Sequence, residues 1–298
     1  MNRNYTMLYS VEHTTTYQYH EHVSLCHNIA ALTPRDTDTQ TCRACNIIVS
    51  PLPEVLEEHI DFFGNKLYYF VIEQEHEQLT VTVRSQVEKI DAINIPPNYS
   101  TQPWEKVRDI LEHSTGEFMA EKQFTHPTPI TAATPEIKNY AAISFTPGNP
   151  LFEAVNDLTK RIHTDFKFTP GFTTVSTPLS VVMTERKGVC QDFAHLAISC
   201  VHSMGLPARY ISGYLETLAP VGKDKLVGVD ASHAWLSVFI PGMGWVDFDP
   251  TNNQLATEQY ITIGWGRDYF DIIPLKGVIM SSSSHELKVS VDVRRMQE

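Results

Sequence analysis

An apolar stripe in the second half of the chain limits the possible fold more than any other feature. From Cys190 onward, apolar residues recur every three or four positions, which predicts a helix from about Cys190 to Met204 with a buried face. Gly205 and Pro207 supply its stop signal. Three extended stretches follow, at residues 209–215, 233–240 and 245–249. This order predicts a helix packed on an antiparallel sheet.

Strand-like alternation dominates the first hundred residues. Apolar, aromatic and hydroxyl side chains take every second position from Tyr9 to Tyr19, and apolar side chains alternate with polar ones at residues 79–84. A Gly-Asn pair within residues 63–66 predicts a tight turn, because both residue types tolerate positive φ. The Ile-Pro-Pro-Asn run at residues 95–98 predicts a break. A small β-sandwich is the simplest fold for this region.

Helical spacing begins after that break. Trp104, Val107 and Leu111 lie on one face of a predicted helix, and a second helix is predicted to start at Leu151. Strand alternation returns at residues 287–293. The predicted fold class is therefore α+β. An N-terminal β-domain is expected at residues 1–100, and a helical segment, a catalytic core and a C-terminal strand at residues 101–298.

Composition excludes several classes of partner. The formal net charge is -12 and no cluster of Lys and Arg occurs, which argues against nucleic acid and anionic lipid. No stretch approaches 18 apolar residues, so no membrane span is predicted. Five cysteines in a chain of 298 residues do not form a disulfide scaffold pattern, and the N-terminus lacks the apolar run of a signal peptide. We therefore expect a globular, cytoplasmic protein.

Cys190 has the placement of a nucleophilic thiol. A free thiol is mostly protonated at neutral pH, and the thiolate is the nucleophile. A helix start favours an anion through its unpaired N–H groups and partial positive charge, and Cys190 opens the predicted helix. A nearby imidazole can take the thiol proton and later deliver it to a leaving amine. His233, in the second of the three predicted strands, is the candidate for that base.

A carboxylate is needed to orient the histidine and to stabilise its charged form. Asp247 and Asp249 are two residues apart in one predicted strand, so both share the face of Trp245 and either could reach a neighbouring strand. The pattern alone leaves both open. Pro250 favours an extended conformation at Asp249, which would hold that carboxylate at the strand end. This argument favours Asp249.

These segments resemble the bacterial transglutaminase-like superfamily. The similarity is carried by the core motif, by a second and third motif, and by segments of an N-terminal β-domain and a C-terminal tail. The core motif stands at residues 188–195 and continues through 205–214, the second motif at 233–235 and the third at 244–251. The segments of the N-terminal β-domain stand at residues 13–17, 34–35 and 63–65. Those of the C-terminal tail stand at residues 266–269 and 274–277. The resemblance implies a papain-like core with a catalytic triad, carried over here to Cys190, His233 and Asp249.

The resemblance also implies a reaction, namely acyl transfer from an amide through a thioester, with a peptide or protein amide as substrate and no required cofactor. Members divide between protein cross-linking transglutaminases and hydrolases that include cysteine proteases. Our leading hypothesis is hydrolysis, by a cysteine peptidase or amidohydrolase. The alternatives are a protein-glutamine transglutaminase, which joins glutamine to an amine, and an inactive binding module. The presence of all three triad residues speaks against the last, and the sequence specifies no oligomeric state.

Several neighbours of the triad are weaker candidates. The backbone N–H of Cys190 is the natural first donor to an oxyanion, and the candidates for the second are Gln191 and a hydroxyl from the region of Thr173, Thr174 and Thr177. Trp235 and Asp247 are candidates for the wall of the cleft. His195 is expected to be a hydrogen-bonded structural group, because it projects from the helix in a different direction from Cys190.

Three further features are expected to be structural or unassigned. Asp192 is expected to cap the helix, and Cys200 to lie in the core. Cys42 and Cys45 form a C-x-x-C pattern, but no second ligand pair stands at a spacing suited to zinc, so no metal site is predicted.

Overall fold

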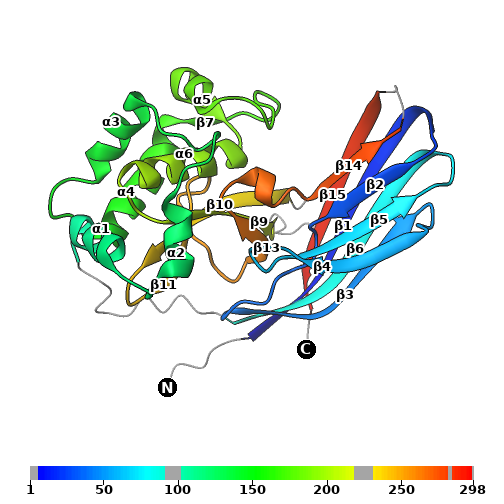
Figure 1. Cartoon of the computed structure of the whole chain (residues 1–298), viewed down its shortest axis with the longest axis horizontal. Coiled ribbons are helices and arrows are strands. Elements are labelled where there is room, and N and C mark those ends of the chain that lie inside the picture. The colour runs from blue at the N-terminus through cyan, green and yellow to red at the C-terminus, as the bar shows by residue number, and fades with distance from the viewer. Residues whose placement is uncertain (1–5, 91–101, 218–230, 281–283, 297–298) are drawn as a thin grey trace, which may run out of the picture.

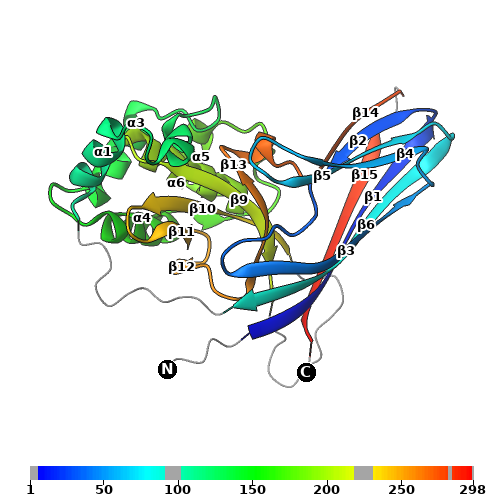
Figure 2. The ribbon, with the colours of Figure 1, turned by 60° about the horizontal axis from the view of Figure 1, so that its bottom comes forward.

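The computed structural model describes residues 6–90, 102–217, 231–280 and 284–296, and it has the predicted α+β class. A β-sandwich forms one side of the molecule, and a sheet covered by helices forms the other (Figures 1 and 2). The predicted break at residues 95–98 lies outside the described residues. Within the described ranges, no helix combines the length and apolarity needed to cross a membrane.

The sandwich consists of two four-stranded antiparallel sheets, in the orders β15-β1-β6-β3 and β14-β2-β5-β4. Its strands are β1 (Thr6–Val23), β2 (Cys26–Ala30), β3 (Gln40–Ser50), β4 (Val55–Ile60), β5 (Lys66–Ile72), β6 (His76–Ile90), β14 (Leu275–Ile279) and β15 (His285–Arg295). As the alternation predicts, Val11, Leu79, Val81 and Val83 are buried. The predicted turn before β5 is present, with Gly64 at φ +78°.

The end of the chain completes the sandwich. β15 pairs with β1 in an antiparallel register that runs from Tyr9 opposite Arg295 to Tyr19 opposite His285, and β14 pairs with β2. The predicted boundary puts this C-terminal strand with the core at residues 101–298, but its hydrogen bonds place it in the N-terminal sheet. Alternation predicts a strand and carries no information about a partner this distant, so a boundary drawn at residue 100 separates strands of one sheet.

The other half of the molecule packs helices on a five-stranded antiparallel sheet, the core sheet, in the order β12-β11-β10-β9-β13. The strands are β9 (Ala208–Leu215), β10 (Ala231–Ile240), β11 (Gly244–Asp249), β12 (Gln254–Leu255) and β13 (Tyr260–Gly266). The α-helices are α1 (Trp104–His113), α2 (Met119–Lys122), α3 (Pro135–Ser144), α4 (Leu151–Asp165), α5 (Leu179–Glu185) and α6 (Cys190–Ser203). Two short parallel strands, β7 (Lys167–Phe168) and β8 (Lys187–Gly188), lead into α5 and α6.

The predicted helix at Cys190 is α6, and it is the centre of this half. Its stripe packs against apolar side chains of β9 and β10 on one side and of α3, α4 and α5 on the other. Phe193, Leu196, Ala197, Cys200 and Val201 are at most 2% exposed. Because α6 is enclosed on several sides, its first turn is held in a fixed place relative to the sheet.

Two amide side chains join the sandwich to the core sheet. Gln40 of β3 accepts the N–H of Thr262 at 2.9 Å and donates to the carbonyl of the same residue at 2.7 Å. Asn65 makes the equivalent pair of hydrogen bonds with Trp265. An amide side chain can satisfy one backbone donor and one acceptor together. The two amides thus hold β13 against the sandwich at both ends of that strand.

Candidate active site

Cys190 is the first residue of α6 and is half-buried. Phe193 donates the bond that closes the first helical turn, to the Val189 carbonyl at 3.1 Å. The N–H groups of the three preceding residues, from Cys190 to Asp192, are those that a helix start leaves without a partner within the helix. The Asp192 carboxylate accepts the N–H of Val189 at 2.7 Å and the Thr173 hydroxyl at 2.6 Å. The predicted capping role of Asp192 is therefore confirmed.

His233 lies near the start of β10, and its imidazole interacts with both predicted partners. Its Nε2 donates to Asp249 Oδ2 at 2.7 Å. Cys190 also lies close enough to act on the His233 side chain, and this interaction helps to raise the pKa of His233. Because Nε2 is taken by the carboxylate, Nδ1 is the nitrogen left for the thiol. The structure thus brings Cys190, His233 and Asp249 together from a helix and two neighbouring strands.

The Asp249 carboxylate is fully buried and is saturated with donors. Besides His233, its Oδ2 accepts the Tyr260 hydroxyl and the Asn252 side-chain amide, both at 2.6 Å. Its Oδ1 accepts the backbone N–H of Thr251 at 2.8 Å and that of Asn252 at 3.3 Å. Such a buried carboxylate can remain ionised only when donors replace its lost water.

The pKa shifts of the pair follow from these contacts. Burial on its own lowers the pKa of His233, but the hydrogen bonds and charges of Asp249 and Cys190 outweigh it, and the net shift is upward. Burial raises the pKa of Asp249, but His233, Tyr260 and Asn252 outweigh it, and the net shift is downward. Both shifts favour an imidazolium beside a carboxylate at neutral pH.

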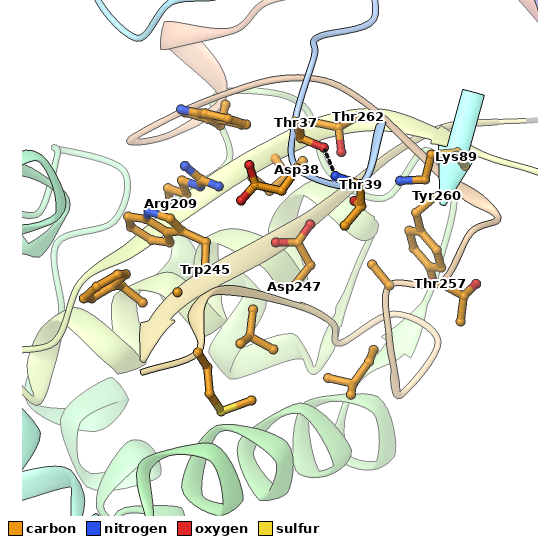
Figure 3. Close-up of a pocket in the computed structure, with 18 of the residues that line it drawn as sticks. Thr37, Asp38, Thr39, Lys89, Arg209, Trp245, Asp247, Thr257, Tyr260 and Thr262 are labelled. Carbon is orange, nitrogen blue, oxygen red and sulfur yellow. Dashed lines mark hydrogen bonds between the residues drawn. The ribbon is translucent and has the colours of Figure 1, made fainter. Parts of the chain in front are cut away.

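Asp247 occupies a different position from Asp249. Its Oδ2 accepts the Trp235 indole N–H at 3.0 Å, and it lines a cavity (Figure 3) whose lining residues do not include Cys190. Of the two carboxylates that the strand pattern left open, Asp249 is therefore the one that contacts His233. The structure gives a physical reason: β11 ends at Asp249, and the following turn folds back to donate to its carboxylate.

Trp235 packs against the His233 ring. It is fully buried, so it does not form the wall of an open cleft as the sequence analysis considered, and its ring stacks on the His233 imidazole with centroids 6.0 Å apart. Gly213 lies opposite His233 in the β9–β10 register. A side chain at Gly213 would collide with the Ile261 carbonyl and the Trp235 ring, so this close packing requires glycine.

The remaining predicted residues divide into two groups. Gln191, the second residue of α6, is half-buried beside Cys190, and its part in an oxyanion hole stays a prediction. His195 is buried, and its Nε2 accepts the Tyr269 N–H at 3.1 Å. Burial also lowers the pKa of His195 to about 3, which keeps the ring neutral. These contacts confirm that His195 is a structural group, and Cys200 lies in the core as expected.

Sequence reasoning missed Tyr260 and Asn252, the two side chains that share Asp249 with His233. Asn252 had a local signal, since an Asp followed by a turn with Asn at the third position is typical of side-chain to backbone capping. Tyr260 comes from the far edge strand β13, and no local pattern connects it to β11.

Comparison with known families finds matches on both halves of the chain. A family described as bacterial transglutaminase-like N-terminal region matches residues 9–88, and one described as transglutaminase-like superfamily matches residues 140–250. The second match contains Cys190, His233 and Asp249. The first lies within the sandwich.

Individual proteins are also similar to this chain. The uncharacterized protein Rv2569c of Mycobacterium tuberculosis is 42% identical over 97% of this chain and 93% of its own length. A candidate cysteine protease from Cytophaga hutchinsonii, known from its crystal structure, superposes with a TM-score of 0.76 at 21% identity, over 99% of this chain and 92% of that chain. That likeness establishes a shared fold. A protein-glutamine gamma-glutamyltransferase of Pseudomonas aeruginosa is 36% identical over only 25% of this chain and 11% of its own length.

Proposed function

This chain belongs to the transglutaminase-like superfamily, and on that premise we propose that it is a cysteine-dependent enzyme that hydrolyses amide bonds. The observation that carries the proposal is the buried chain of contacts from Cys190 through His233 to Asp249. Its proposed substrate is a peptide or protein amide. A carboxylate–imidazole–thiol arrangement is how proteins activate a thiolate for attack on an acyl carbon.

The first half of the proposed reaction makes a thioester. The Cys190 thiolate attacks the amide carbonyl, and the oxyanion that forms is stabilised by N–H groups at the start of α6. The His233 imidazolium gives its proton to the amide nitrogen as the carbon–nitrogen bond breaks, and the amine leaves. The acyl group then remains on the Cys190 sulfur, and His233 is neutral.

The second half removes the acyl group. His233 takes a proton from water, the resulting hydroxide attacks the thioester, and the carbon–sulfur bond breaks to give a carboxylic acid and the Cys190 thiolate. Asp249 stays ionised throughout and holds the imidazole in the tautomer that keeps Nδ1 towards the thiol. The five hydrogen bonds on Asp249 support this role, because they fix its position and stabilise its charge.

A transglutaminase is the second candidate, in which an amine rather than water attacks the same thioester. The local similarity to the P. aeruginosa glutamyltransferase favours it. The two reactions share every step up to the thioester and differ in how well the site excludes water and admits an amine.

The deciding experiment is incubation of the purified protein with a diverse peptide library, with and without a primary amine, followed by mass spectrometry. New peptide termini support a peptidase, conversion of glutamine to glutamate supports an amidohydrolase, and amine adducts support a transglutaminase. Cys200→Ser is the matched control, because Cys200 lies on the same helix but is fully buried. Products from wild type and Cys200→Ser but not from Cys190→Ala are expected. The same products from Cys190→Ala would exclude the proposed mechanism.

A further inference from the structure

A cavity of about 810 Å³ lies between the sandwich and the core sheet. One wall comes from β9, β11 and β13, and the other from residues 36–39 and the end of β6 (Figure 3). Among the described residues, its lining includes neither Cys190 nor His233. The volume falls within the range of about 300–1,000 Å³ that is typical of small-molecule sites. It is a second hollow, distinct from the thiol site.

Two buried cations line this cavity. Lys89 at the end of β6 is 6% exposed, and Arg209 of β9 is 8% exposed. Among the described residues, Arg209 Nε is fully enclosed and has no hydrogen-bond partner, while the charge of Asp247 acts on both cations. Burial without a hydrogen-bond partner is costly for a charged group, so Arg209 beside this cavity requires an explanation.

Arg209 is held in place by aromatic rings. Its guanidinium carbon lies 3.7 Å from the centroid of Trp265 and 4.1 Å from that of Trp245. Nε is enclosed, but stacking on the faces of the guanidinium leaves the two Nη groups, which radiate in the plane, at the edge. This is the arrangement in which arginine binds a carboxylate with two parallel hydrogen bonds.

Carboxylates accompany the two cations on the lining. Asp247 lies between Arg209 and Lys89 in Figure 3, and its Oδ2 is already bonded to Trp235. Glu258, also on the lining, is paired with Arg295. Burial lowers the pKa of Lys89 to about 8, against the opposing effect of Asp247 and Glu258, so its amine is still mostly charged at neutral pH. The lining thus places the two cations among three half-buried carboxylates, Glu121, Asp247 and Glu258, of which Glu258 is engaged by Arg295.

The cavity lining combines exposed acidic residues on one loop with apolar residues elsewhere. Asp36 and Asp38 are exposed on the loop that borders the cavity, so a positive group is favoured there. Ile211, Phe239 and Met243 supply apolar surface to the lining. We infer that this interdomain cavity binds an amino acid or short peptide with an apolar side chain. Its carboxylate would contact Arg209 and Lys89, and its ammonium group would face Asp36 and Asp38.

The test measures binding of leucyl-phenylalanine to full-length Cys190→Ala protein, by tryptophan fluorescence and by calorimetry. The Cys190→Ala background prevents any cleavage by the proposed active site, so the result does not depend on the proposed function. We expect saturable binding. We expect affinity to fall about tenfold or more when the probe carries a C-terminal amide, because the anion that both cations contact is lost. N-acetylation is expected to cost less, because the carboxylates at the mouth are exposed.

Variants locate the binding on the protein. Lys89→Met is expected to weaken binding of the free acid about tenfold or more, whereas Lys106→Met, at an exposed lysine of α1, leaves it unchanged. The amide comparison needs no variant, so it remains decisive if Lys89→Met does not fold. Three results would overturn the inference: no binding up to about 10 mM peptide, equal affinity for acid and amide, or unchanged affinity in Lys89→Met. The last would place the peptide in the Cys190 cleft instead.

Discussion

The thiol site and the interdomain cavity lie on neighbouring parts of β11, but they differ in how completely their charged side chains are hydrogen-bonded. At the strand end, Asp249 accepts five hydrogen bonds and its charge is compensated by His233. Two residues earlier, Asp247 faces a cavity that is also lined by the buried cations Lys89 and Arg209, and Arg209 Nε has no hydrogen-bond partner among the described residues. A saturated network fixes the geometry of its members, whereas unpaired buried groups are suited to bind a ligand. This difference is the basis for proposing chemistry at the first region and recognition at the second.

The largest expected effect comes from the two cysteines of α6. Cys190→Ala removes the nucleophile, so we expect turnover to fall by at least about 100,000-fold. Cys200→Ala leaves the rate within about twofold and lowers the free energy of unfolding by about 1 kcal/mol, because it trims a buried side chain. Steady-state kinetics and urea denaturation measure both. A comparable rate loss in Cys200→Ala would show that helix packing, rather than the thiol, limits the reaction.

The next effect separates the two carboxylates of β11. Asp249→Asn is expected to lower kcat by about 100- to 10,000-fold, because the imidazole loses the group that fixes its tautomer. Asp247→Asn should lower kcat by less than about tenfold, since it acts only through Trp235. The ratio of the two kcat values is the measurement. A greater loss in Asp247→Asn would reverse the assignment of the orienting acid.

The pH dependence of stability tests the charged state of the pair. The pKa of His233 is raised, to about 10, so its contribution is complete below the unfolded value of about 6.5 and is lost as pH rises towards 10. The pKa of Asp249 is lowered, so its contribution is present above about 4 and is lost as pH falls below that value. Wild type should therefore exceed Asp249→Asn in stability most between pH 4 and pH 7, as measured by urea denaturation. A difference that is constant with pH would mean that the pair is not ionised.

The smallest expected effect concerns Tyr260, which touches both regions. Tyr260→Phe removes one of the five hydrogen bonds on Asp249 and leaves the ring in place, so we expect kcat to fall by less than about tenfold. Asp249 keeps its other donors, among them Asn252 at 2.6 Å. Kinetics alongside Asp249→Asn measure the effect. A loss as large as that of Asp249→Asn would make Tyr260 essential for the position of the carboxylate.

Local patterns predicted the local parts of this structure. The helix expected from about Cys190 to Met204 spans Cys190–Ser203, and the three strands after it lie within one or two residues of their expected ranges. Pro250 favoured Asp249 over Asp247, and in the structure β11 ends at Asp249, whose carboxylate contacts His233. These features depend on periodicity and on residues next to one another in the chain.

Contacts between distant segments were not accessible in this way. The alternation at residues 287–293 predicted a strand but not its pairing with β1, because any half-buried strand has the same period. Tyr260 reaches Asp249 across the sheet, and Lys89 and Arg209 come together from the sandwich and the core. In a single sequence, none of these pairs leaves a signal at either position.

The central claim is that the Cys190 sulfur carries the acyl group. The most direct test mixes the protein with an activated ester substrate, stops the reaction in acid, and determines the intact mass and the modified peptide by mass spectrometry. We predict an added mass of one acyl group that maps to Cys190, decays with time, and persists longer in Asp249→Asn. Substrate turnover by wild type with no acyl group on Cys190, or with the group on another residue, would contradict the mechanism.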